Sequence, residues 1–165
     1  MTLDNVIKIL KKHKPKNATE ARRAGIALRY INRGAFREVY RLSKLPTLVI
    51  KFPYALDGYN IYESIEHANM EVQKIKKLYR FSTMQPMLPN IFYHDRDTGV
   101  VITEYFPEHK QGMAAQLEEA LSTIQSLINA LTKQRVTDLH RDNVRFTEEG
   151  IKLIDLGYVS DEYDS

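Results

Sequence analysis

The sequence contains no cysteine and no apolar run that could cross a bilayer. Without cysteine, disulfide bonds, thiolate zinc sites and cysteine nucleophiles are excluded, and the absence is compatible with a reducing compartment. A membrane-spanning helix needs about 20 apolar residues, a length that no stretch of this chain approaches. Residues 1–10 also lack the basic-then-apolar order of a signal peptide. We therefore expect a soluble, cytoplasmic protein with no membrane partner.

Charge of one sign is not in large excess either. The 24 basic residues stand against 21 acidic residues, which gives a net charge of +3 and an isoelectric point near 9.0. Lysines gather in residues 8–16 and 74–80, and we interpret both groups as solvated helix faces. We expect no nucleic-acid partner. With 43% hydrophobic residues, the 165-residue chain suffices for one compact domain or two small lobes.

Hydrophobic periodicity predicts a mixture of helices and strands. Apolar residues at spacings of three and four indicate helices at residues 3–12, 60–79 and 113–133. Asn17 begins a further short helix that ends at Gly25. Strand-forming runs occupy residues 26–42, with a break at 32–34, and residues 47–52, 90–94 and 99–106. Leu45 and Pro46 predict a turn.

Residues 136–158 hold two acids and an amide at a spacing that has a chemical meaning. Residues 144–146 and 151–154 predict a hairpin whose turn, residues 147–150, ends in glycine. If Phe146 pairs with Ile151, Asn143 falls opposite Ile154 and beside Asp155, at a Cβ separation of roughly 5 Å. An amide oxygen and a carboxylate together suit a hard cation such as Mg²⁺. Asp138, on the approach to the hairpin, is left as a base.

This segment resembles the catalytic segment of the protein-kinase-like phosphotransferases. That family carries an Asp, an Asn five residues later and the metal-binding Asp of a D-F-G triplet. The matching residues here are Asp138, Asn143 and Asp155, the last within the triplet D-L-G. The resemblance implies ATP and Mg²⁺ as cofactors, with Asn143 and Asp155 as metal ligands and Asp138 as the catalytic base.

Residues 140–142 read H-R-D, the same letters as the kinase triplet, but this match is false. Asp142 immediately precedes Asn143, whereas the family places its base five residues before the asparagine. The base is therefore assigned to Asp138, with Val136 and Thr137 where the family has His and Arg.

A lysine stands in the apolar strand at residues 47–52. An unpaired buried ammonium is costly, so Lys51 either reaches outward or is paired. Glu71 lies beside the apolar stripe of the helix at 60–79, where its carboxylate needs a cation, and we predict Lys51 as that partner. The resemblance implies that Lys51 binds the nucleotide phosphates and that Glu71 positions it.

The break at residues 32–34 falls where the family has its glycine-rich phosphate loop. The pattern G-x-G-x-x-G would fall on Asn32, Gly34 and Arg37, so only the middle glycine remains. Loss of two glycines removes conformational freedom and close approach to phosphate. Gly34 is kept as a nucleotide-binding residue, and Arg33 or Arg37 is expected to supply positive charge.

The strand at residues 99–106 resembles the strand that leads into the kinase hinge, whose backbone binds adenine. The resemblance puts Thr103 at the gatekeeping position and Glu104, Tyr105 and Phe106 in the hinge.

The matched residues extend over about 29–158 and imply an α+β, two-lobed, protein-kinase-like fold. We expect a helical extension at residues 1–28, an antiparallel N lobe with one helix at 29–105, and a reduced, mainly helical C lobe at 106–165. The chain ends seven residues after Tyr158, so the activation segment and substrate-binding helices of the family are expected to be missing.

The expected function is that of a minimal ATP- and Mg²⁺-dependent phosphotransferase, a serine/threonine protein kinase acting on a protein substrate. One alternative is a nucleotide-binding or scaffold module that works through a protein partner. Another is a small-molecule kinase, because Asp138, Leu139 and His140 resemble the D-L-H-x-x-N motif of aminoglycoside phosphotransferases.

Overall fold

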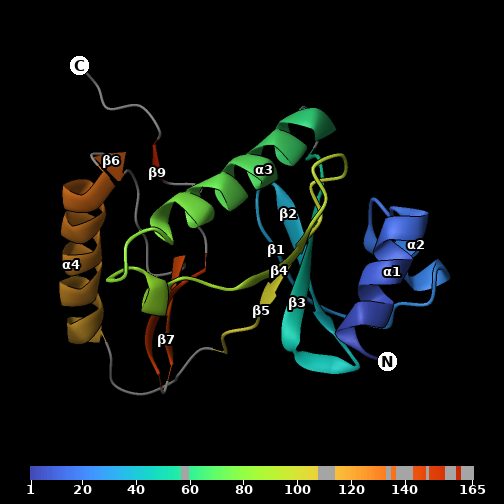
Figure 1. The fold of residues 1–165 in the computed structure, drawn as a ribbon, viewed down its shortest axis with the longest axis horizontal. Coiled ribbons are helices and arrows are strands. Elements are labelled where there is room, and N and C mark those ends of the chain that lie inside the picture. The colour runs from blue at the N-terminus through green and yellow to red at the C-terminus, as the bar shows by residue number, and fades with distance from the viewer. Residues whose placement is uncertain are drawn as a thin grey trace. The chain divides into compact units, whose positions relative to one another are not determined.

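The computed structural model describes residues 1–56, 60–107, 114–132, 135–136, 143–147, 149–154 and 159–160 (Figure 1). The chain forms two compact units. The first comprises Met1–Val72 and Asn90–Tyr105, and the second comprises Gln73–Pro89 and Phe106–Ser165. Helices and antiparallel strands occur together, which confirms the predicted α+β class.

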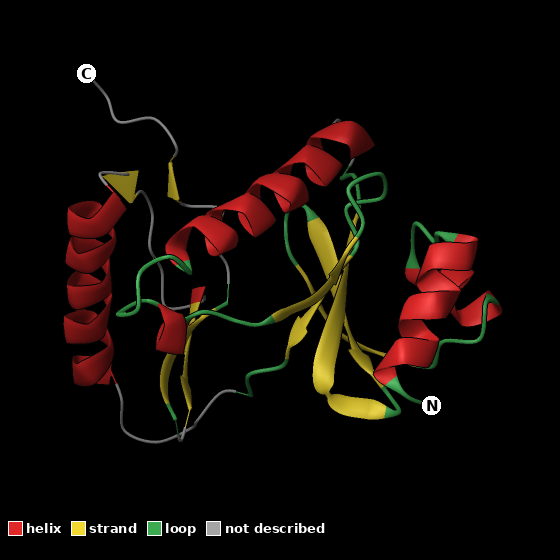
Figure 2. Ribbon diagram, in the orientation of Figure 1, coloured by secondary structure: helices red, strands yellow, loops and turns green. Residues whose placement is uncertain are grey.

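The first unit is built on a five-stranded sheet in the order β1-β2-β3-β5-β4, in which all neighbouring strands are antiparallel (Figure 2). Its strands are β1 (Leu28–Arg33), β2 (Arg37–Leu42), β3 (Leu45–Pro53), β4 (Ile91–His94) and β5 (Val101–Glu104). The helix α3 (Ile61–Leu78) follows β3 in the chain. An antiparallel sheet with one inserted helix is the arrangement predicted for this part of the sequence.

Two short helices cover one face of this sheet. In α1 (Leu3–His13), the Thr2 side chain caps the first turn, and the helix ends at Lys14 in the left-handed conformation. In α2 (Ala18–Arg23), the Asn17 side chain accepts a hydrogen bond of 2.9 Å from the N–H of Glu20. Both helices contribute to one apolar core with the sheet, made of Val6, Leu10, Ala18, Ala21, Ile26, Tyr40, Leu42, Leu48, Ile50, Phe52, Val100 and Ile102.

The alternation of side chains along β3 divides the two faces of the sheet. Leu48, Ile50 and Phe52 belong to the apolar core with α1 and α2. Lys51 must therefore point to the opposite face, since successive strand residues alternate. The first part of α3 lies on that side, as Figure 1 shows. The face of the sheet toward α1 and α2 thus carries the apolar core, and the opposite face carries Lys51.

The turn between β2 and β3 differs from the prediction. It is formed by Ser43 and Lys44, and both Leu45 and Pro46 belong to β3. The ladder between β2 and β3 shifts register between Arg41 and Leu42. Proline lacks a backbone N–H, and Pro46 is accommodated at this irregularity, where no regular ladder bond is lost.

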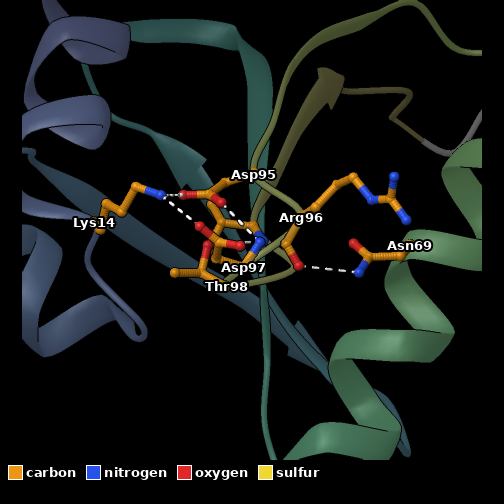
Figure 3. A network of polar contacts seen from close by, with 7 residues as sticks. Lys14, Asn69, Asp95, Arg96, Asp97 and Thr98 are labelled. Atoms are coloured by element: carbon orange, nitrogen blue, oxygen red, sulfur yellow. Dashed lines mark hydrogen bonds and ion pairs between the residues drawn. The ribbon is translucent and has the colours of Figure 1, made fainter.

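The turn between β4 and β5 is bonded to helices on both sides (Figure 3). Lys14 Nζ donates to Asp97 Oδ2 at 2.7 Å and lies 3.6 Å from Asp95 Oδ2. The hydrogen bond raises the pKa of Lys14 and lowers the pKa of Asp97. On the other side, Asn69 of α3 donates to the carbonyl of Arg96 at 3.0 Å. The turn therefore connects α1 and α3 through the edge of the sheet.

Gly99 closes that turn in a position that only glycine fits. Its φ is +72°, and a Cβ there would lie 2.7 Å from Pro53 Cγ and 3.1 Å from Ile65 Cα. The second contact is with backbone, so α3 could not pack in its present position.

We predict that Gly99→Ala destabilises the protein by about 3 kcal/mol, from left-handed strain plus overpacking. Gly25→Ala is the matched control, because its φ is +105° but a Cβ there meets nothing within 4 Å. Urea unfolding followed by circular dichroism measures both. Equal losses for the two variants would contradict the close packing of α3 against Gly99.

Tyr40 lies beneath α2 in a polar corner of the core. Its ring is 7% exposed, and its hydroxyl donates to Glu38 Oε2 at 2.5 Å. The guanidinium of Arg22 lies over the ring at 5.3 Å. Burial, with a further contribution from the hydrogen bond to Glu38, raises the pKa of Tyr40 to about 12.

This pKa predicts a loss of stability in alkaline solution. An unfolded tyrosine deprotonates near pH 10, so between about pH 10 and 12 the unfolded state binds fewer protons and stability falls as pH rises. The contribution is complete below pH 10. We expect the free energy of unfolding to fall less over this interval in Tyr40→Phe than in the wild type. Tyr62→Phe, at a side chain that is 73% exposed, should follow the wild type; parallel curves for all three proteins would show the shift to be absent.

The second unit contains α4 (Ala114–Thr132), the hairpin of β7 (Val144–Thr147) and β8 (Gly150–Leu153), and the pair β6 (Arg135–Val136) and β9 (Val159–Ser160). A 3-10 turn, η1, spans Gln85–Met87. Lys152 anchors the hairpin, because its ammonium donates to the Pro86 carbonyl at 2.6 Å and lies 5.6 Å from the centre of the Phe106 ring. In the described part of the chain, none of the helices has the length and apolar character to cross a membrane.

Candidate functional site

The hairpin of β7 and β8 has the register that the sequence predicted. Phe146 pairs with Ile151, and the N–H of Ile154 donates to the carbonyl of Asn143 at 2.8 Å. Asn143 therefore stands opposite Ile154, and Ile154 is the residue that precedes Asp155 in the chain. The connection is shorter than expected, because Thr147 already pairs with Gly150 and two residues remain between the strands.

Two members of the predicted catalytic set, Asp138 and Asp155, lie outside the described residues. Their roles as base and metal ligand remain predictions. Asn143 is described and half-buried. Within the ranges that the structure describes, no group of three or more His, Asp or Glu side chains could hold a metal ion.

Lys51 is buried in the middle of the sheet, with 8% of its surface exposed. It stands opposite Val39 of β2, and Arg37 lies two residues before Val39 on the same face. Thr103 of β5, at 3% exposure, stands opposite Val49 and shares this face as well. The sequence therefore brings a lysine, an arginine and the predicted gatekeeping threonine to the side of the sheet on which α3 packs.

The cation bound to Glu71 is Arg37, where the sequence predicted Lys51. Arg37 Nη1 donates to Glu71 Oε1 at 3.0 Å, and Nη2 donates to Oε2 at 2.8 Å. The two residues are 8% and 3% exposed. A guanidinium presents two parallel donors that match a carboxylate, which an ammonium cannot do. The glycine-loop pattern assigns Arg37 to the phosphate loop, so the sequence did not predict this pairing. The available signal was a charged side chain within a strand.

The connection between β1 and β2, which contains Gly34, is held at several points. The N–H of Gly34 donates to the carbonyl of Arg37 at 2.8 Å, and the carbonyl of Phe36 accepts from the N–H of Tyr54 at 2.9 Å. The ring of Phe36 stacks on His67 of α3 with a centroid distance of 4.4 Å. A Cβ at Gly34 would meet only the Arg37 carbonyl, at 4.0 Å, so packing does not require glycine here.

Both arginines that are expected to supply charge to this loop make a contact within the first unit. Arg37 binds Glu71, and the guanidinium of Arg33 lies 5.1 Å from the centre of the Tyr54 ring.

The predicted hinge begins at the end of β5. The Glu104 carboxylate accepts a hydrogen bond from the N–H of Asn90 at 2.8 Å, which orders the entry to β4. The N–H of Tyr105 donates to the carbonyl of Thr47 at 2.8 Å. Because this N–H is engaged within the sheet, an adenine contact by Tyr105 would fall to its carbonyl. Phe106 belongs to the second unit.

Comparison with known proteins finds similarity to solved structures only. No protein-family profile and no curated protein matches the chain. The solved structure titled "PpkA-294 apo form" is 21% identical with a TM-score of 0.49 and covers 78% of this chain, which spans 57% of that one. The ternary complex of streptomycin, ATP and APH(2")-IIa is 12% identical with a TM-score of 0.48, over 97% of this chain and 72% of that one. Because both TM-scores lie below 0.5, we base the functional proposal on the residues of this chain.

We predict that Glu71→Gln destabilises the protein by roughly 3 to 5 kcal/mol, because it leaves the buried Arg37 guanidinium without its countercharge. Glu66→Gln, on an exposed position of the same helix, should change the free energy of unfolding by less than about 0.5 kcal/mol. Chemical denaturation measures both. A loss at Glu71 no larger than at Glu66 would mean that the ion pair contributes little.

Proposed function

We propose that this chain is an ATP- and Mg²⁺-dependent phosphotransferase of the protein-kinase type, which transfers the γ-phosphoryl group to a hydroxyl. The observation that carries the proposal is the register of the β7–β8 hairpin. It fixes Asn143 opposite Ile154, and Asp155 is the residue that follows Ile154 in the chain. The spacing of Asp138, Asn143 and Asp155 has a chemical meaning only if this register is present.

The donor set fits magnesium. The backbone carbonyl of Asn143 is bonded to the N–H of Ile154, so the proposed ligand is its side-chain amide oxygen. Asp155 adds a carboxylate, and an oxygen-only set with few protein ligands is what Mg²⁺ prefers. When bound, the ion neutralises charge on the phosphate oxygens.

The proposed roles of the remaining residues follow from their chemistry. Lys51 is a compact point charge in a mostly buried position, suited to the α- and β-phosphates. Thr103 and residues 104–106 line the adenine, and Gly34 belongs to the loop over the phosphates. Asp138 orients the acceptor hydroxyl and takes its proton. Catalysis of this kind is mainly positioning and electrostatic stabilisation.

We propose a serine or threonine hydroxyl of a protein as the acceptor. Asp138, Leu139 and His140 also match the motif of small-molecule kinases, and a module that binds ATP without transfer remains the third candidate. The acceptor is therefore tested by experiment and not assumed in the assay.

We expect Mg-ATP at a hundredfold excess over its dissociation constant to stabilise the protein by about 2.7 kcal/mol. For a chain of this size the melting temperature should rise by roughly 5 to 11 °C. Asp138→Ala should show the same rise, because the base does not bind nucleotide, but no transfer of radiolabelled phosphate to lysate proteins. A wild type without a thermal shift would refute nucleotide binding.

The outcomes separate the three candidates. Label in lysate proteins that depends on Asp138 supports the protein kinase, and label in small hydroxyl compounds only supports the small-molecule kinase. A thermal shift with no label in either proteins or small hydroxyl compounds leaves the binding module. Equal labelling by the wild type and Asp138→Ala would remove Asp138 as the base.

A further inference from the structure

Arg37 stands at the boundary between the loop assigned to the phosphates and the strand β2. We propose that Arg37 is a positioning residue for the nucleotide: by pairing with Glu71 it latches the loop of residues 34–37 to α3. This inference rests on the proposed function and adds a residue to it. The role assigned to Lys51, that of binding Glu71, is transferred to an arginine on a different strand.

The latch has two contact points between the same two segments. His67 and Glu71 are four residues apart on α3 and therefore point from one face of the helix. Phe36 and Arg37 are adjacent at the end of the loop. Phe36 stacks on His67 at 4.4 Å with an interplanar angle of 17°, and Arg37 forms two hydrogen bonds of 3.0 and 2.8 Å with Glu71. A stacking contact and a bidentate ion pair together restrict both sliding and rotation of the loop on the helix.

Because both side chains are buried, the ion pair needs both of its partners. Arg37 and Glu71 are 8% and 3% exposed, so water cannot substitute for either partner. The backbone of the loop is closed as well, because the N–H of Gly34 donates to the Arg37 carbonyl and the N–H of Tyr54 donates to the Phe36 carbonyl. The position of the loop is thus set by α3 on one side and by the end of β3 on the other.

The pairing leaves the proposed role of Lys51 unchanged. Glu71 forms its bidentate contact with Arg37, and Lys51 stands on the same face of the sheet, in the position proposed for a contact with phosphate. In this proposal Arg37 positions the loop by binding Glu71, and Lys51 binds the nucleotide phosphates. The sequence prediction assigned both contacts to Lys51.

The experiment uses the full chain and two readouts, the melting temperature without nucleotide and the dissociation constant for Mg-ATP by calorimetry. Arg37→Met and Glu71→Met should each lower the melting temperature and weaken Mg-ATP binding at least tenfold. The double variant replaces a buried ion pair by apolar side chains, so it should recover the melting temperature. Its affinity for Mg-ATP should stay at least tenfold below that of the wild type.

Three further variants control for charge, geometry and folding. Arg29→Met removes an exposed arginine of β1 and should leave both readouts unchanged. Arg37→Lys keeps the charge but loses the two parallel donors, and it should bind Mg-ATP with intermediate affinity. Phe36→Ala removes the stacking contact without leaving a buried charge, so it should fold and weaken Mg-ATP binding about fivefold.

Recovery of both readouts in the double variant would show the pair to be structural only and would overturn the inference. Wild-type affinity in both Arg37→Met and Phe36→Ala would overturn it as well, with the proposed function intact. A wild type that binds no Mg-ATP would instead refute the proposed function and remove the basis of the inference.

Discussion

The ion pair between Arg37 and Glu71 joins the strand β2 to the helix α3 in the interior of the first unit. Arg37 and Glu71 are only 8% and 3% exposed. Two buried charges are tolerated only when they pair in good geometry. One comes from a strand and the other from a helix, so their meeting fixes which face of α3 turns toward the sheet. Apolar side chains can repack with modest cost, whereas a carboxylate that misses its guanidinium cannot.

The opposite face of the sheet has the complementary chemistry. Leu48, Ile50 and Phe52 form an apolar core with α1 and α2, and apolar burial is not directional. At the rim of this side, Lys14 at the end of α1 donates to Asp97 in the turn between β4 and β5 (Figure 3). The same turn is bonded to Asn69 of α3, and Gly99 in it allows the close approach of Ile65. The turn between β4 and β5 is thus bonded to the end of α1 on one face of the sheet and to α3 on the other.

Much of the local structure was predictable because its signals are local. Period and capping predicted α1, α2, α3 and α4 to within one or two residues, with Asn17 as the cap of α2. The register of the β7–β8 hairpin followed from placing its turn at residues 147–150, although Thr147 and Gly150 already pair. The turn after β2 was misplaced, because proline usually marks a turn and a shift in the ladder here accommodates Pro46 within β3.

The sequence by itself determined the α+β class, the order of the elements, the neighbourhood of Asn143 and Ile154, and the fact that Glu71 needs a cation. Only the tertiary structure decided that this cation is Arg37. Both Arg37 and Lys51 carry a positive charge on the same face of the sheet, and sequence spacing cannot rank them. The partner of Glu71 is the side chain that reaches α3 with two parallel donors. Which side chain reaches α3 depends on how the helix crosses the sheet, and Arg37 and Glu71 are 34 residues apart in the chain.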